Sequence, residues 1–397
     1  MASVAEHENQ AAYARAGAVS AVTSVAIYGS LAEAEAIWRG METPDYLHTS
    51  FQRFDFLNAW QAHAGAHLNI KPLIVVASDR GGRPLILLPL GSVRENGVNI
   101  ARFLGGKHPT FNMGLWRRDF AASACKADID TILAAIVAHG DRIDLLALTQ
   151  QPERWDGVLN PLAHFSRQLS ANACPLLRMP PGAHPEDIIS SGFRRRIRAK
   201  EKKLKALPGY RFFLARTDED ITRVLDAFFT IKPLRMAAQN LPNVFADPGI
   251  EAFIRTACLS KAPNDGRAIA IHTLECDNEI IAMFAGVADG HRISMMFNTY
   301  TMSENAKYSP GLILLRNIID HYTELGYCAF DLGIGSDDYK RWFCKDDEPI
   351  FDSFIPLSAY GRLAALGMSS LNHAKRMVKQ NPALVAMAHR LRAALHR

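Results

Sequence analysis

The second half of this chain shows an order of secondary-structure signals that few folds satisfy. Three runs rich in apolar and β-branched residues (268–275, 280–288 and 292–300) are separated by short turns at Asn278 and Gly290, which predicts an antiparallel meander. A helix is expected over 221–229, before this meander, and a helix over 310–325 and a strand over 328–332 follow it. Because a helical crossover joins parallel strands, this order predicts a mixed sheet, and ligands tend to bind where strand connectivity changes.

The N-terminal half is predicted to be mixed α/β as well. Strands are expected over 23–28 and 144–148, helices over 31–41, 50–63 and 128–138, and a hairpin over 73–77 and 84–90 around Gly81 and Gly82. A last strand is expected over 351–356. The fold class expected for the whole chain is therefore α/β, with an α+β mixed sheet in each half.

The length of the chain, 397 residues, exceeds the roughly 250–300 residues that one core supports, so two domains are expected. Proline and glycine interrupt the pattern between 171 and 185, where we place the boundary. The expected division is a flexible leader (1–20), an N-terminal domain (21–180), a C-terminal domain (186–358) and a basic helical tail (359–397).

The most informative motif is Ser309-Pro310-Gly311 at the start of the helix predicted over 310–325. Serine is a good N-cap, proline suits the first helical position, and glycine lets another group approach the first turn. The free N–H groups and the dipole of such a helix start favour anions, and a pyrophosphate fits there. An ordinary capped helix is the alternative.

Two sequences after this helix carry a family resemblance: Phe330-Asp331-Leu332-Gly333, and a Tyr-Lys-x-x-Phe motif that begins at Tyr339. With the helix start, they resemble the BioF2-like or cellulose-biosynthesis-type (CelD-like) acetyltransferases, relatives of the FemAB peptidyltransferases in the GNAT superfamily. The segment 193–204 is similar to the arginine-rich helix of that family. The resemblance implies tandem GNAT-like acyl-CoA N-acyltransferase domains, of which the N-terminal one is degenerate.

The resemblance also implies a site. It places the pyrophosphate of acyl-CoA, with acetyl-CoA as the expected donor, near Tyr308, Ser309, Gly311 and Leu312. Lys340 would stabilise an oxyanion or hold a phosphate, while Asp331 and Tyr339 are the proposed proton acceptors. The superfamily's full glycine-rich loop is not present, because this segment keeps one glycine.

The segment 194–205 has eight Lys or Arg residues and only Glu201 as an acid. Arg194, Arg195 and Arg198 are the candidate contacts to an anionic substrate or donor. Phe193 and Ile197 share one helical face, so a docked helix with solvated basic sides is an alternative. RNA binding is a third interpretation, since clustered cations bind phosphates.

The tail from 361 to 397 has seven Lys or Arg and no Asp or Glu. Leucine and methionine alternate with these cations, and Pro382 separates two predicted amphipathic helices. We expect the apolar faces to dock on the protein itself. A protein partner or an anionic membrane surface is the alternative.

Several classes of protein do not fit the sequence. Its six cysteines form no C-x-x-C pair, no apolar run reaches the roughly 18 residues of a membrane span, and no P-loop, dinucleotide or metalloprotease motif occurs. No metal cofactor is expected, and the N-terminus is that of a cytoplasmic protein, with the inner membrane as a peripheral location.

Three functions remain as hypotheses. The first is transfer of an acyl group from acyl-CoA to an amine or hydroxyl of a small molecule or glycan, such as a sugar, polysaccharide precursor or amino-acid-like acceptor. The second is a FemAB-like transferase that uses aminoacyl-tRNA. The third is a non-catalytic accessory protein of a polysaccharide apparatus.

Overall fold

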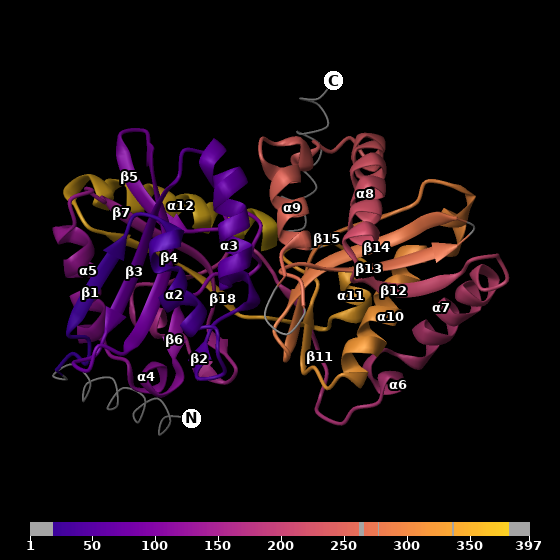
Figure 1. Ribbon diagram of the computed structural model, residues 1–397, viewed down its shortest axis with the longest axis horizontal. Coiled ribbons are helices and arrows are strands. Elements are labelled where there is room, and N and C mark those ends of the chain that lie inside the picture. Colours follow the sequence, from indigo (N-terminus) through magenta and orange to yellow (C-terminus); the bar gives the residue numbers. More distant parts are fainter. Residues whose placement is uncertain (1–18, 262–265, 277, 336, 381–397) are drawn as a thin grey trace.

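The computed structural model describes residues 19–261, 266–276, 278–335 and 337–380, and it contains two large mixed sheets that lie side by side (Figure 1). The N-terminal half builds most of one sheet and the C-terminal half most of the other. The mixed α/β class expected from the sequence is confirmed. Among the described residues, no helix combines the length and apolarity needed to cross a bilayer.

The first sheet has the strand order β1-β3-β4-β5-β7-β18-β10, with β6 on β4 and β2 on β6. Only β5 and β7 pair in parallel. The strands are β1 (Ser24–Tyr28), β2 (Tyr46–Leu47), β3 (Lys71–Ser78), β4 (Pro84–Glu95), β5 (Val98–Phe103), β6 (Leu115–Arg117), β7 (Leu145–Pro152), β10 (Gln168–Leu169) and β18 (Ile350–Pro356). The helices of this half are α2 (Leu31–Gly40), α3 (Phe54–Trp60), α4 (Arg118–Ser123) and α5 (Lys126–Ala138), joined by α12 (Ala359–Gln380) from the chain's end.

The second sheet has the order β12-β13-β14-β15-β16-β11-β17, and only β15 and β16 pair in parallel. Its strands are β11 (Pro175–Arg178), β12 (Arg211–Ala215), β13 (Ala270–Cys276), β14 (Glu279–Ala288), β15 (Arg292–Tyr300), β16 (Ala329–Asp331) and β17 (Asp346–Asp347). The helices are α6 (Pro185–Ile188), α7 (Ser191–Leu204), α8 (Asp218–Ala238), α9 (Ile250–Leu259), α10 (Pro310–Glu324) and α11 (Lys340–Phe343). The meander β13-β14-β15, the crossover helix α10 and the parallel strand β16 are those that the sequence predicted.

Shorter elements complete the chain. They are the 3-10 turns η1 (Ser50–Gln52), η3 (Pro161–His164), η4 (Val244–Ala246) and η6 (Glu304–Tyr308), the π-helical turn η2 (Gln61–Gly65), and the small hairpin of β8 (Arg154–Trp155) and β9 (Val158–Leu159).

The two halves exchange strands. β11 lies in the segment where the sequence suggested a domain boundary, yet it pairs with β16 in the second sheet. β18, which we had assigned to the C-terminal domain (186–358), instead pairs with β7 in the first sheet. Chain position does not decide which open sheet edge a strand joins, so the sequence could not reveal this exchange.

Local corrections concern three segments. The helix predicted over 50–63 is divided into η1, α3 and η2, and β5 was not predicted. The helix predicted over 221–229 continues to Ala238 through Pro233, although proline removes one helical hydrogen bond. Buried Leu225, Phe228 and Met236 on both sides of the proline hold the helix together by packing. Residues 1–18 of the predicted leader (1–20) and the second tail helix, beyond Pro382, lie outside the described residues.

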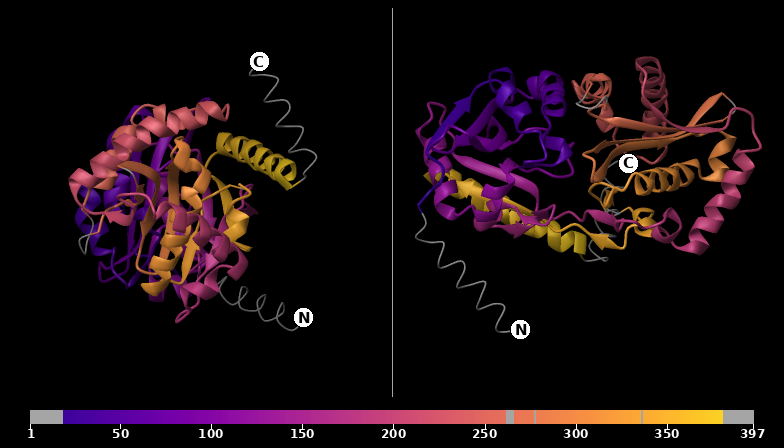
Figure 2. Two further views of the ribbon diagram at one scale, coloured as in Figure 1. Left: turned by 90° about the vertical axis from the view of Figure 1, so that its right-hand side faces the viewer. Right: turned by 60° about the horizontal axis from the view of Figure 1, so that its bottom comes forward.

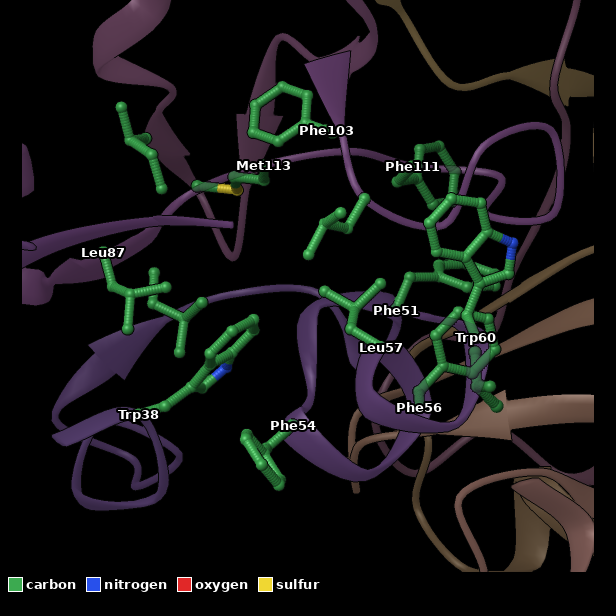
Figure 3. Close-up of a cluster of buried hydrophobic side chains, with 14 of the residues drawn as sticks. Trp38, Phe51, Phe54, Phe56, Leu57, Trp60, Leu87, Phe103, Phe111 and Met113 are labelled. Carbon is green, nitrogen blue, oxygen red and sulfur yellow. The ribbon is translucent and has the colours of Figure 1, made fainter. Parts of the chain in front are cut away.

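One apolar core runs from the first sheet into the second half. Figure 3 shows its aromatic part, in which Phe51, Phe56 and Trp60 lie close together and Trp38 lies apart from them, near Phe54. The ring of Phe56 meets that of Phe253 on α9 at 5.4 Å, edge to face. Each such buried side chain contributes about 1.5–3 kcal/mol, so this shared core holds the halves against each other.

Candidate functional site

The N-terminus of α10 has an unusual backbone. Ser309, at the N-cap, has φ 58° and ψ 53°, a left-handed conformation that costs a non-glycine residue about 1–2 kcal/mol. Its side chain makes no capping bond and instead accepts a hydrogen bond from Nζ of Lys200 on α7, at 2.7 Å. The first N–H groups of a helix have no partner within the helix. Lys200 therefore adds a positive charge to an end that already favours anions.

A cavity of about 300 Å³ opens beside this helix start. Its walls are mostly apolar, and its polar atoms come from a few side chains at the helix start and on β15. The lining residues are Phe284, Asn298, Tyr300, Ala306, Ser309, Gly311, Leu312, Leu315, Tyr339 and Trp342. Of the residues predicted from the sequence, Ser309, Gly311, Leu312 and Tyr339 come together here. Tyr308 packs against the apolar core beside them.

The parallel pairing of β15 and β16 is short. Their ladder has three residue pairs and ends at Ser294 and Asp331, whereas β15 continues to Tyr300. Gly333, with φ 70°, follows β16 and lies so close to β15 that an added Cβ would be 3.0 Å from the carbonyl of Met295. β16 has ended by then, so the rest of β15 has no strand of the described chain paired to that edge.

Tyr339 was expected to accept a proton. Its hydroxyl bonds to the side chain of Asn298, and burial raises the pKa of Tyr339 to about 12. The phenol is therefore protonated at neutral pH, and it can donate a proton but is a poor base. The raised pKa favours Tyr339 as a proton donor, and its role as a proton acceptor stays a prediction.

Asp331 ends β16, as the sequence predicted, but its surroundings were not foreseen. Its carboxylate is fully buried and lines neither this cavity nor the one on the other face of β15. It accepts hydrogen bonds from the guanidinium of Arg292 at 3.2 Å and from the amide of Gly333 at 3.1 Å. Arg292 also lies over the rings of Phe111 and Trp155, at 4.6 and 4.7 Å. Asp331 therefore fixes the end of the parallel pair and the contact between the halves, and no proton acceptor emerges there.

Lys340 is buried as well. Its ammonium donates to the carbonyls of Gly333 and Ile334, at 3.2 and 3.0 Å, and lies 3.5 Å from Asp337. Lys340 does not line the cavity. Lys340 therefore holds the loop after β16, and its contact with an oxyanion or a phosphate stays a prediction.

The three arginines proposed to bind substrate are divided. Arg194 is buried and pairs with Asp320 at 2.8 Å, and Arg198 pairs with Glu186. Arg195 is exposed to solvent. α7 is therefore a docked helix whose inner cations are neutralised. The sequence did not single out Lys200, because nothing local links it to Ser309, 109 positions away.

A second cavity, of about 190 Å³, lies between the halves on the opposite face of β15, where Met296 and Phe297 line it. The other lining residues are Lys107, His108, Val244, Phe245, Ile250 and Ile254. His108 accepts a hydrogen bond from the indole of Trp60 at 3.3 Å, and burial lowers its pKa to about 4. Its imidazole is neutral at pH 7.

In the described part of the chain, no group of three or more His, Cys, Asp or Glu side chains is placed to hold a metal ion.

Comparison with known proteins agrees with this geometry. Residues 191–341 match the family described as acetyltransferase (GNAT) domain. The C-terminal half contains a GNAT domain. No curated protein matches the chain at a significant level.

Solved structures extend the similarity to both halves. FemX aligns with a TM-score of 0.54 at 8% identity, over 84% of this chain and 98% of that one. The C-terminal domain of a protein named as a lysylphosphatidylglycerol synthetase, from Agrobacterium fabrum, aligns with a TM-score of 0.52 at 11% identity, over 87% and 97%. L-PGS from Bacillus licheniformis aligns with a TM-score of 0.50 at 12% identity, over 88% of this chain and 99% of that one. At these identities the likeness is one of fold.

Proposed function

We propose that this protein transfers an acyl group from acyl-CoA to an amine or hydroxyl of a sugar, polysaccharide precursor or amino-acid-like acceptor. The observation that carries the proposal is the start of α10, where Ser309 and Lys200 form a cationic helix terminus at a cavity that borders β15 beyond its pairing with β16. The diphosphate of CoA fits the terminus. The apolar cavity suits the pantetheine arm and a short acyl chain, with acetyl as the first candidate.

The chemistry requires little from the protein. The acceptor's nitrogen or oxygen attacks the thioester carbonyl, the C–S bond breaks, and the departing thiolate needs a proton. Tyr339, protonated and lining the cavity, is positioned to donate that proton. The proton lost by the acceptor passes to solvent or to a base that the acceptor itself brings.

The acceptor is proposed to enter from the second cavity. Both cavities border the same stretch of β15, one through Asn298 and Tyr300 and the other through Met296 and Phe297. The unpaired edge of β15 lies between them, so a donor on one face and an acceptor on the other meet at that edge. His108, neutral in this pocket, offers a hydrogen bond to a hydroxyl or amide of the acceptor.

The N-terminal half has the same strand plan but a blocked helix start. At α5, the helix between its parallel strands, Asp128 accepts hydrogen bonds from the amides of Cys125 and Ala21 and from the hydroxyl of Ser20. A carboxylate at this terminus repels a phosphate. The donor is therefore assigned to the C-terminal half alone.

Calorimetry with acetyl-CoA, CoA and longer acyl-CoAs tests the proposal. Gly311→Phe places a ring in the cavity, because Gly311 lines it and an added Cβ would lie 3.4 Å from the ring of Tyr300. This variant should lose binding. Gly192→Phe, at an open position in the first turn of α7, is the matched control and should bind as the natural protein does. Absence of binding to every acyl-CoA at millimolar concentration would defeat the proposal.

Aminoacyl-tRNA is the second candidate donor. It is favoured by the exposed cations of α7, Arg195, Lys202 and Lys203, which lie on the same helix as Lys200, and by the fold shared with FemX. Filter binding of charged tRNA should then weaken steeply with salt. An affinity equal to that for random RNA would leave acyl-CoA as the donor.

The BioF2-like resemblance supports, as part of this proposal, an acceptor from envelope or exopolysaccharide synthesis and a reaction in the cytoplasm. A non-catalytic accessory role remains the third reading. A Tyr339→Phe variant that loses transfer in vitro but retains full biological activity would favour the accessory role.

A further inference from the structure

Helix α12 docks on the first sheet through its small residues. Its inner face lies against β18, β7 and β5. Gly361 approaches the carbonyl of Asp144 so closely that an added Cβ would lie 1.7 Å from the oxygen. Ala365, on the same side of the helix, is buried. The helix is therefore fixed in rotation, and its opposite face is fixed toward solvent.

That outer face is apolar. Six large hydrophobic side chains along it are exposed, with exposed fractions between 37% and 70%. They are Tyr360, Leu363, Leu366, Leu371, Met377 and Val378. At 100° per residue they lie within about 140° of arc, opposite Gly361 and Ala365. Figure 2 shows α12 along the outside of the first sheet, where no other described element covers this face.

Cations flank the apolar stripe. Arg362 and Lys375 lie about 40° outside the two edges of this stripe, whereas Arg376 and Lys379 lie on the side of Gly361 and Ala365. Arg142, which pairs with Asp144, stacks near the ring of Tyr360 at the helix start. Among the described residues, Arg362, Lys375 and Arg376 form no ion pair. The sequence from 361 to 397 has no acidic residue, so nothing along this segment neutralises them.

We propose that α12 is a membrane-docking face that binds the surface of an anionic lipid bilayer. An exposed apolar stripe with Arg362 and Lys375 beside it fits an interface where apolar side chains enter the acyl boundary while the cations meet lipid phosphates. A second copy of the chain fits less well, because pairing two such faces brings like charges together. The surface lies on the first sheet, so the proposal stands apart from acyl transfer.

Vesicle co-sedimentation of the full chain, without any acyl donor, tests the proposal. We expect binding to phosphatidylcholine vesicles that contain phosphatidylglycerol, and at least tenfold weaker binding when salt is raised to about 0.5 M, where the screening length falls below about 5 Å. Leu363→Glu with Leu366→Glu should reduce binding at least tenfold. Leu68→Glu, at a similarly exposed leucine on the same half, is the control and should bind normally.

Two further measurements keep the result decisive. Circular dichroism and thermal unfolding should show both variants folded, as expected for side chains more than half exposed. Light scattering should show the same mass for all. Equal or negligible sedimentation with neutral and anionic vesicles would overturn the proposal. A dimer that the Leu363→Glu and Leu366→Glu variant converts to a monomer would also overturn it and assign the face to a second copy.

Discussion

Replacing Lys200 by alanine tests the donor site at the group that the sequence did not reveal. Its ammonium contacts Ser309 at the start of α10 and, with acyl-CoA bound, is expected to contact a phosphate. A hydrogen bond between charged groups contributes about 1.5–3 kcal/mol, and partial exposure of Lys200 places it at the lower end. About 1.5 kcal/mol corresponds to a tenfold weaker affinity.

The assay is calorimetric titration with acetyl-CoA, with turnover measured at saturating donor. Lys200→Ala should bind about tenfold more weakly, while kcat stays within twofold because Lys200 lies at the phosphates and not at the thioester. Lys203→Ala, an exposed lysine on the same helix, is the control. Equal affinities of the two variants would refute the assignment of Lys200 and of the helix start as the phosphate site.

Three further variants probe the groups around the site. His272 is fully buried, and burial lowers its pKa to about 3. The free energy of unfolding should therefore fall as the pH drops below 6.5, and it should be about 2 kcal/mol lower at pH 5. Urea unfolding of the His272→Leu variant should lack this pH dependence. Arg292→Met leaves Asp331 as an uncompensated buried carboxylate and should cost about 3–5 kcal/mol, which the double variant with Asp331→Asn should partly restore. Tyr339→Phe should lower kcat about 100-fold with little change in KM, and an unchanged kcat would remove its role as proton donor.

Local signals predicted much of the second sheet. The meander over β13, β14 and β15 and the start of α10 at Pro310 follow from turn residues and strand patterns that act over a few positions. The cavity residues Asn298 and Tyr300 can also be recognised in the sequence, as polar side chains two positions apart in β15. Their spacing alone did not indicate a binding site, because the helix start that completes the cavity lies elsewhere in the sequence.

Long-range features escaped prediction because they depend on partners far along the chain. Lys200 reaches Ser309 only because α7 packs against α10. Lys340 and Asp331 were placed near the right loop, but their environments were not foreseen. Burial and neighbouring carbonyls or cations decide whether a titratable group meets a ligand, and a motif carries no information about either.

The strand exchange gives a structural reason for the presence of both halves, although only one of them carries the donor motif. Each half contributes a strand to the sheet of the other half. β11 joins the second sheet, and β18 joins the first. Arg292, reaching from β15 to the rings of Phe111 and Trp155, fastens the same junction. The N-terminal half therefore holds the wall of the second cavity, through Lys107 and His108, at a fixed distance from the edge of β15. If the acceptor binds there, the half without a donor site determines which acceptor reaches the thioester. Substitutions at His108 should then change the choice of acceptor and leave acyl-CoA affinity as it was.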